Sequence, residues 1–235
     1  MSLPSSYKLI RSEPSGVTDF AMTRLVSRVA MTLVLLLTAL TAAASAATQH
    51  VVLAGGCFWG MQAVFESVKG VTKVVAGYSG GNFLTAHYEL VSTGTTGHAE
   101  SVDVTYDPAR VSFADLLRVY FLVAHDPTEL NRQGPDEGSQ YRSEIYYTSA
   151  AQRDQAQAEI ARLERDHVFG APIVTKLAPL AGFYPAEQYH QNYLVHNPDS
   201  PYIVYNDIPK LIALREKFPT LARMDAAPMR VAMRR

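Results

Sequence analysis

Apolar residues along the chain change between the spacing typical of strands and the spacing typical of helices. Short runs that are β-branched, or that alternate with polar residues, predict strands over residues 50–54, 71–78, 98–106, 142–148 and 175–180. Apolar residues three and four positions apart predict helices over residues 57–67, 112–121, 150–167 and 185–194. Residues 79–97 and 131–138 are polar and irregular, so we expect loops there. Because strands and helices alternate, the pattern favours an α/β or α+β domain with helices packed on one sheet.

The sequence predicts a secretory leader before this domain. From Met22 the chain has a basic start, an apolar stretch over residues 29–40 and small residues (Ala-Ser-Ala) at 44–46, which is the pattern of a signal peptide. We therefore predict a leader over residues 1–46, with Met22 as the true start, a signal peptide over 22–46 and export of the domain to the periplasm. A retained, uncleaved anchor is the alternative, although the apolar stretch is shorter than the about 20 residues of a membrane span.

Composition limits what the rest of the chain can be. A chain of 235 residues that is 48% apolar can bury the core of one ordinary domain, which we place at residues 47–218. Residues 219–235 are rich in Met, Ala and Arg and show no face to bury, so they are predicted to be disordered. The formal net charge of −1, without a clustered basic face, argues against a nucleic-acid partner. We expect a monomer with no stable membrane span once the leader is removed.

The first candidate catalytic residue is Cys57, the only cysteine of the chain. It follows a predicted strand and Gly55-Gly56, and it opens a predicted helix whose N-terminus can stabilise a thiolate. Such settings lower the pKa of a cysteine from about 8.5 to roughly 3.5–7.5. A small buried hydrophobic residue is the alternative, but a lone cysteine in an exported protein also indicates a reactive thiol. We therefore expect Cys57 to be a reactive thiolate.

The second candidate is Glu100, in the predicted strand over residues 98–106. Alternation along this strand places Glu100 on the same face as Val102 and Val104. Burial on an apolar face raises the pKa of a carboxyl group toward the range in which it can donate a proton near neutral pH. A strand-end glutamate that reaches solvent is equally compatible with the periodicity.

Several other kinds of chemistry lack the residues they need. The chain has no H-E-x-x-H motif, phosphate-binding loop or dinucleotide fingerprint. With one cysteine it can form neither a C-x-x-C pair nor the zinc site of a nucleobase deaminase. A Cys–His acyl-transfer hydrolase remains an alternative, in which one of five histidines would reach Cys57: His98, His125, His167, His190 or His196. A non-catalytic module that binds a small polar ligand is the other alternative.

Five short motifs along the chain carry a more specific signal. They are Gly56-Cys57-Phe58-Trp59-Gly60, Gly77-Tyr78-Ser79-Gly80-Gly81, Gly97-His98-Ala99-Glu100, Gln140-Tyr141-Arg142-Ser143 and Tyr189-His190-Gln191-Asn192-Tyr193-Leu194. In this order they resemble the motifs of the A-type peptide methionine sulfoxide reductases, and the resemblance covers about residues 50–218. It implies a ferredoxin-like α+β sandwich with a mixed sheet, which reduces the S epimer of methionine sulfoxide, free or in peptides, without a metal or an organic cofactor.

The same resemblance implies roles for individual residues. Cys57 resembles the nucleophile that attacks the sulfoxide sulfur and becomes a sulfenic acid. Glu100 resembles the acid beside the sulfoxide oxygen. Phe58 and Trp59 match the aromatic wall around the substrate's methyl group. Tyr88 and Tyr141 match the two tyrosines that hydrogen-bond its oxygen, and Asp136 matches an acidic helper.

The chain departs from many relatives in its C-terminal region, where they carry resolving cysteines. Here residues 197–205 contain none, so the chain cannot form a disulfide of its own. We expect an external thiol to form a mixed disulfide with Cys57 and a second thiol to release it. The donor would be a thioredoxin-like domain, glutaredoxin or glutathione, and export would require reducing equivalents to cross the membrane.

Overall fold

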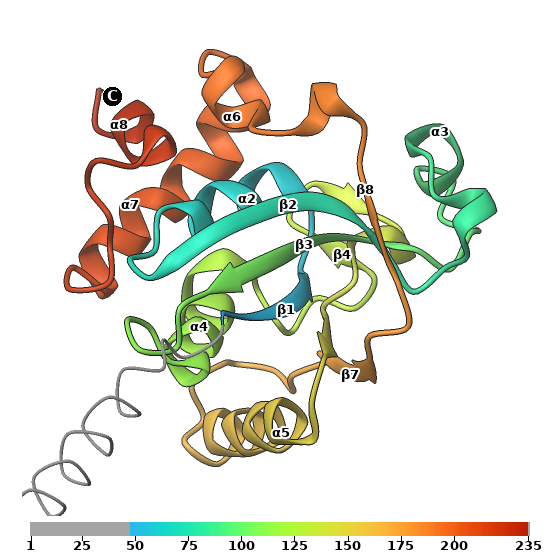
Figure 1. Ribbon diagram of the computed structural model, residues 1–235, viewed down its shortest axis with the longest axis horizontal. Helices are drawn as coiled ribbons and strands as arrows, with labels where there is room; N and C mark the ends of the chain where they lie inside the picture. Colours follow the sequence, from blue (N-terminus) through green and yellow to red (C-terminus); the bar gives the residue numbers. More distant parts are fainter. Residues whose placement is uncertain (1–47, 235) are drawn as a thin grey trace, which may run out of the picture. The chain divides into compact units, whose positions relative to one another are not determined.

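A mixed β-sheet forms the centre of the domain. The computed structural model describes residues 48–234, and the predicted leader over residues 1–46 lies outside them. In this part of the chain six strands pair in the order β7-β6-β1-β3-β2-β8, antiparallel except for β6 and β7 (Figure 1). The strands are β1 (Gln49–Ala54), β2 (Val71–Ser79), β3 (Ala99–Tyr106), β6 (Glu144–Tyr147), β7 (Lys176–Pro179) and β8 (Phe183–Pro185). A separate hairpin joins β4 (Arg132–Gln133) to β5 (Asp136–Glu137).

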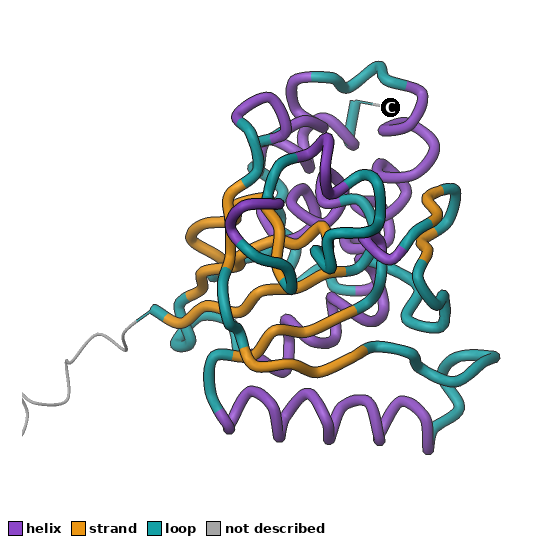
Figure 2. Tube along the Cα trace, turned by 90° about the vertical axis from the view of Figure 1, so that its right-hand side faces the viewer, coloured by secondary structure: helices purple, strands orange, loops and turns teal. Residues whose placement is uncertain are grey.

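Helices pack against the sheet and enclose most of the apolar core. They are α2 (Phe58–Glu66), α3 (Tyr88–Val91), α4 (Phe113–Val119), α5 (Ala150–Arg165), α6 (Tyr193–His196), α7 (Ile208–Lys217) and α8 (Ala227–Ala232). A π-helical turn continues α4 over Tyr120–Ala124, and another precedes α7 over Ile203–Asp207. Short 3-10 turns cover Phe83–Thr85, Ser139–Tyr141 and Gln188–His190. In both views α5 lies along the β6–β7 edge of the sheet (Figures 1 and 2).

The two faces of the sheet carry different cores. One face shares a large cluster of buried side chains with α2, α4 and α7, which contains Val102 and Val104 of β3. A smaller cluster on the other face contains Val52, Ala99 and Tyr146. The connection from β7 to β8 crosses this second face in Figure 1 and covers part of it. The central strands are therefore buried on both sides, which is why their apolar runs are long.

Most of the predicted elements are confirmed. Each of the five predicted strands is present within about two residues of its expected ends, and so are α2, α4 and α5. Ser112 caps α4 as its sequence position indicates, because its hydroxyl accepts a hydrogen bond of 3.1 Å from the Asp115 N–H. The α+β class with a mixed sheet and packed helices is confirmed as well.

The C-terminal part of the chain differs from the prediction. The expected disorder over residues 219–235 is wrong for the part that the structure describes, since α8 lies there and Met229 is fully buried. The Arg223 N–H donates to the Ser67 carbonyl at 2.7 Å, which ties this segment to the end of α2. The segment was missed because its apolar positions are too few to show a period, and it becomes ordered by packing on α2 and α7.

Three smaller differences concern short elements. The helix expected over residues 185–194 is a 3-10 turn and the four-residue α6, separated by Asn192 in a left-handed conformation with φ of 55°. The expected loop over residues 79–97 contains α3, and β8 and α7 were not predicted. Over residues 48–234, the helices are too short or too polar to cross a bilayer.

Candidate active site

Cys57 is the N-cap residue of α2, at the point where the chain leaves β1. Two glycines make the sharp turn from β1 into α2 possible. A Cβ atom on Gly55 would lie 2.9 Å from the His125 ring. Gly56 has a φ of +90°, and a Cβ atom there would lie 2.5 Å from the Gln133 side chain. The predicted strand, glycine turn and helix N-terminus around Cys57 are thus confirmed, and the residue is 7% exposed.

The electrostatic surroundings of Cys57 correct one expectation. Burial raises the pKa of the Cys57 thiol well above its ordinary value, and the carboxyl groups of Glu100, Asp207 and Asp136 raise it further. The N–H of Trp59, in the first turn of α2, lowers the pKa, but by less. The expected lowering of the thiol pKa is therefore wrong for the substrate-free protein, because desolvation outweighs the helix N-terminus.

Glu100 is buried beside Cys57, which decides between the two alternatives that the strand alternation left open. Its side chain is on the face of β3 that packs on α2, and the residue is 2% exposed. Its Oε2 accepts a hydrogen bond of 3.1 Å from the N–H of Phe58, the residue that follows Cys57. Burial raises the pKa of Glu100 to about 8, although the Phe58 hydrogen bond opposes the shift. Glu100 is therefore a protonated acid at neutral pH, held at the N-terminus of α2.

Aromatic rings surround the first turn of α2. The Phe58 ring is buried, with its centroid 5.0 Å from that of His190. Trp59 is half-buried and stacks on Tyr193 with centroids 3.6 Å apart, and its indole N–H donates to His190 Nδ1 at 3.2 Å. Tyr202 and Trp59 meet in a T-shaped arrangement with centroids 5.7 Å apart. These rings hold Phe58 and Trp59 in place and give the site an apolar wall.

Tyr88 and Tyr141 approach the same site from two other segments. Tyr88 begins α3, and its ring centroid is 4.5 Å from that of His190. Burial raises the pKa of both phenols, and the groups that raise them further include Glu100 and Cys57 in each case. Both tyrosines therefore remain neutral hydrogen-bond donors close to the thiol and the acid.

Asp136 completes the predicted set from the small β4–β5 hairpin. The Tyr202 hydroxyl donates a short hydrogen bond to Asp136 Oδ2. Burial raises the pKa of Asp136, although Tyr202 and Lys210 oppose the shift. The structure thus brings all seven predicted residues into one region: Cys57, Phe58, Trp59, Tyr88, Glu100, Asp136 and Tyr141.

Several residues for which the sequence predicts no site role complete this region. Glu187 accepts from the Tyr78 hydroxyl at 2.8 Å and from the Tyr88 N–H at 3.0 Å, and so fixes the start of α3. Asp207 is fully buried on the π-helical turn before α7, where burial raises its pKa to about 6. Tyr202 and Asp207 lie in a segment without strand or helix periodicity, so no signal in the sequence marks them.

The structure does not favour a Cys–His hydrolase. His125 is the histidine that packs against the glycine turn, but its ring nitrogens are engaged by the Tyr120 carbonyl at 2.9 Å and by the Ser143 hydroxyl at 2.7 Å. Burial lowers its pKa to about 4. Among residues 48–234, no histidine hydrogen-bonds Cys57, and no group of three or more His, Cys, Asp or Glu side chains is placed to hold a metal ion.

Comparison with known proteins gives a consistent result. A family model described as peptide methionine sulfoxide reductase matches residues 49–221. The chain is 53% identical over 178 residues to "Peptide methionine sulfoxide reductase MsrA 2" of Mesorhizobium japonicum, which covers 76% of this chain and 91% of that protein. It is 50% identical over 171 residues to the protein of the same name from Synechocystis sp., covering 73% of this chain and 80% of that protein.

Two solved structures share the fold. Methionine sulfoxide reductase A of Corynebacterium diphtheriae is 35% identical with a TM-score of 0.57, over 64% of this chain and 76% of that one. Mxr1 from Saccharomyces cerevisiae in its reduced form is 32% identical with a TM-score of 0.59, over 65% of this chain and 87% of that one.

Proposed function

Because the chain belongs to the peptide methionine sulfoxide reductase family and is an oxidoreductase that reduces peptide methionine sulfoxide with a thiol reductant, we propose that Cys57 is its nucleophile and Glu100 its acid. The observation that carries this proposal is the position of the protonated Glu100 carboxyl on the N–H of Phe58, directly beside the thiol. Sulfoxide reduction requires a sulfur that attacks and a proton for the oxygen that departs. We further propose that the S epimer is the substrate.

The proposed step balances without a cofactor. The Cys57 sulfur attacks the sulfoxide sulfur, the S–O bond breaks, and the oxygen is transferred to Cys57, which becomes a sulfenic acid while methionine leaves. Glu100 gives its proton to the sulfoxide oxygen, and the proton of the thiol replaces it, so the carboxyl is unchanged at the end. The N-terminus of α2 stabilises the negative charge that develops on the Cys57 sulfur as its proton leaves.

The remaining residues of the site act on the substrate's oxygen and methyl group. The neutral hydroxyls of Tyr88 and Tyr141 donate to the sulfoxide oxygen as negative charge develops on it, which lowers the barrier because the donors are already oriented. Phe58 and Trp59 hold the methyl group against apolar rings. Asp136 orients the same region through its bond to Tyr202.

The enzyme returns to its reduced form by external thiols. A first thiol condenses with the Cys57 sulfenic acid to give a mixed disulfide and water, and a second thiol releases Cys57. The absence of a second cysteine from the 235 residues supports this route. Thioredoxin, glutaredoxin and glutathione are the reductants we propose, acting on a monomer in the periplasm, to which the leader over residues 1–46 would export it.

One assay on the full chain tests the proposal. A chromophore-labelled methionine sulfoxide and dithiothreitol are supplied, and the methionine formed is followed for the wild type and for Cys57→Ser. We expect turnover only in the wild type, and only with the S epimer. Ester cleavage without loss of sulfoxide would instead indicate the hydrolase, and binding without turnover would indicate a non-catalytic module. Cell fractionation and mass spectrometry of the N-terminus, expected at residue 47, test the export.

A further inference from the structure

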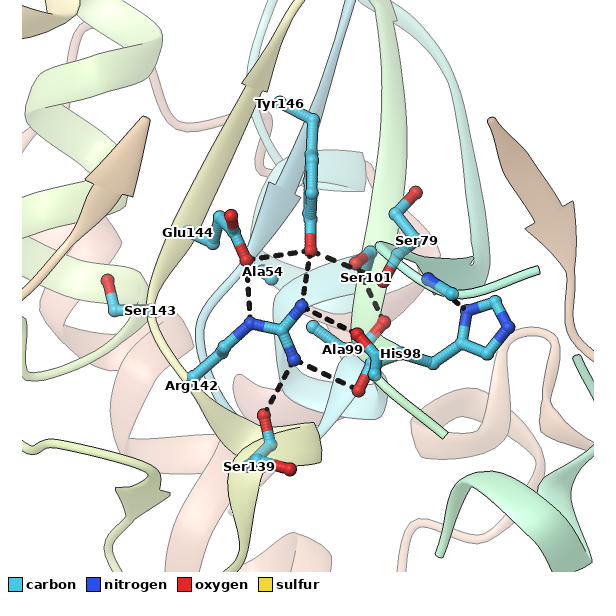
Figure 3. A network of polar contacts seen from close by, with 12 residues as sticks. Ala54, Ser79, His98, Ala99, Ser101, Ser139, Arg142, Ser143, Glu144 and Tyr146 are labelled. Carbon is cyan, nitrogen blue, oxygen red and sulfur yellow. Dashed lines mark hydrogen bonds and ion pairs between the residues drawn. The ribbon is translucent and has the colours of Figure 1, made fainter. Parts of the chain in front are cut away.

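A second polar cluster lies on the face of the sheet opposite to Glu100, centred on Arg142 (Figure 3). Its Nε donates to Glu144 Oε2 at 2.6 Å. Nη1 donates to the carbonyls of His98 at 3.0 Å and Ser139 at 2.9 Å, and Nη2 donates to the Gly97 carbonyl at 2.9 Å. The fifth hydrogen bond, 2.8 Å long, runs from Nη2 to the Tyr146 hydroxyl. All five N–H donors of this guanidinium are therefore used.

The cluster is largely closed to water and rigid. The Arg142 and Glu144 side chains are 12% and 9% exposed. The Tyr146 hydroxyl is also 2.8 Å from Glu144 Oε2 and 3.2 Å from the Ser79 carbonyl at the end of β2. A Cβ atom on Gly80 would lie 2.6 Å from Arg142 Nη2, so the chain leaves β2 directly against the guanidinium. Fully satisfied networks of this kind hold their members in one arrangement.

Arg142 joins the segments that carry Glu100 and Tyr141, the two residues proposed to act on the sulfoxide oxygen. The Gly97 and His98 carbonyls lie just before Glu100, at the start of β3. The Ser139 carbonyl belongs to the 3-10 turn that ends at Tyr141. Over residues 48–234, the hydrogen bonds of Arg142 go to neither of these two side chains. Arg142 fixes the backbone from which each of them projects.

We propose that Arg142 is a positioning residue for sulfoxide reduction, which sets the mutual placement of Glu100 and Tyr141 by clamping Gly97, His98 and Ser139. This rests on the roles proposed above for Glu100 and Tyr141. A lysine could keep the charge but has three donors on one nitrogen, without the planar fork. It cannot span the three carbonyl groups and Glu144 at once. Misplacement of a reacting group by about 1 Å can cost about 10²-fold in rate.

The test compares Arg142→Lys with the wild type in two backgrounds of the full chain. In the natural background we expect the rate of methionine formation in a single turnover to fall by about 10- to 100-fold. In the Glu100→Ala, Tyr141→Phe background we expect a loss below about twofold, because the groups that Arg142 positions have been removed. Equal losses in both backgrounds would show that Arg142 acts elsewhere and would overturn the proposal.

Two control variants separate positioning from stability. Arg162→Lys makes the same change in α5, where Arg162 pairs with Glu159 and Asp166 on the surface, and we expect the wild-type rate. Leu163→Ala creates a cavity in the core beside α5. If it slows turnover as much as Arg142→Lys does while the chain stays folded, the effect is structural and the proposal is wrong. Tyr146→Phe, which removes one hydroxyl, gives a milder version of the test if Arg142→Lys fails to fold.

A titration of Glu100 tests the same proposal without catalysis. The groups that face this carboxyl are the Phe58 N–H, Cys57, Tyr78, Tyr88, Asp136 and Tyr141. Its protonated C=O stretch is followed by infrared difference spectroscopy and assigned by its loss in Glu100→Gln. We expect Arg142→Lys to move the titration from about 8 toward lower pH, because the carboxyl becomes more hydrated. An unmoved titration contradicts the proposal even if the protein proves to have no reductase activity.

Discussion

The carboxyl of Glu100 accepts a hydrogen bond from the Phe58 N–H, so the acid and the N-terminal turn that carries Cys57 form one unit. The bond joins residues 42 positions apart and lies in the buried interior. It explains how one site can hold a protonated carboxyl and a thiol together, because the N–H anchors the acid without forcing it to ionise.

The first prediction concerns the pH dependence of turnover. Because the pKa of Glu100 is raised to about 8, the fraction that can donate a proton falls as the pH rises through that value. We expect the rate of methionine formation to decline above about pH 8 in the wild type. In Glu100→Gln this decline should disappear, since the amide does not titrate.

The size of the loss distinguishes the two substitutions at Glu100. Glu100→Gln should slow turnover, because the amide can hydrogen-bond the sulfoxide oxygen but cannot give it a proton, and Glu100→Ala, which also removes that hydrogen bond, should lose about 10²-fold or more. Steady-state rates with saturating reductant measure both. Equal rates for the wild type and Glu100→Ala would remove Glu100 from the mechanism.

The second prediction concerns the cost of burying Glu100. The pKa of Glu100 is about 8 in the folded protein, against an ordinary value of 4.5. The contribution of its protonated form to the stability of the fold is therefore complete below pH 4.5 and is lost as the pH rises toward 8. Glu100→Gln should therefore stabilise the protein increasingly over this range, by on the order of 3 kcal/mol at the upper end. Urea unfolding of both proteins at pH 5 and pH 8 measures the difference, and a difference independent of pH contradicts the prediction.

The third prediction concerns the reactivity of the thiol. Since burial and nearby carboxyl groups raise the pKa of Cys57, alkylation of the substrate-free protein by iodoacetamide should become fast only above the ordinary cysteine range. Asp207→Asn removes one of these charges and should move the alkylation profile to lower pH. Asp154→Asn on the exposed surface of α5 is the matched control and should leave the profile unchanged. A profile centred near neutral pH in the wild type would contradict the raised pKa.

The fourth prediction concerns the glycine turn before Cys57. Gly56→Ala combines a φ of +90° with a contact of 2.5 Å to Gln133, and should cost about 1–3 kcal/mol of stability. It should also slow turnover, because the start of α2 has to shift. Gly170→Ala, where nothing lies within 4 Å of the added atom, is the control. Thermal unfolding and the turnover assay measure the two effects, and equal behaviour of the two variants would show that the turn is not constrained.

The fifth prediction concerns the stoichiometry of the reaction without reductant. With one cysteine per chain, the enzyme should form one methionine and stop at the sulfenic acid. Dimedone labelling followed by mass spectrometry should place the adduct on Cys57. Two methionines per chain would require a second reducing group and would contradict the external-thiol route.

The local part of this site could be predicted from short stretches of sequence. A strand, two glycines and a helix place Cys57 at a helix N-terminus whatever the rest of the chain does, because backbone geometry and capping depend on near neighbours. Alternation along β3 likewise placed Glu100 on the same face as Val102 and Val104. The alternation left its burial and exposure equally open, and the packing of α2 on that face resolved it.

The electrostatics of the site depended on contacts between distant segments. The raised pKa of Cys57 comes from burial together with Glu100, Asp136 and Asp207, which arrive from three other parts of the chain. The contacts of Tyr202 with Asp136 and of Arg142 with Gly97 join residues 66 and 45 positions apart. No period in the sequence encodes such pairs, because they form only when helices and strands pack. Local patterns therefore determined where the reactive groups are, and packing determined their protonation and mutual distance, since desolvation and charge act through space and not along the chain.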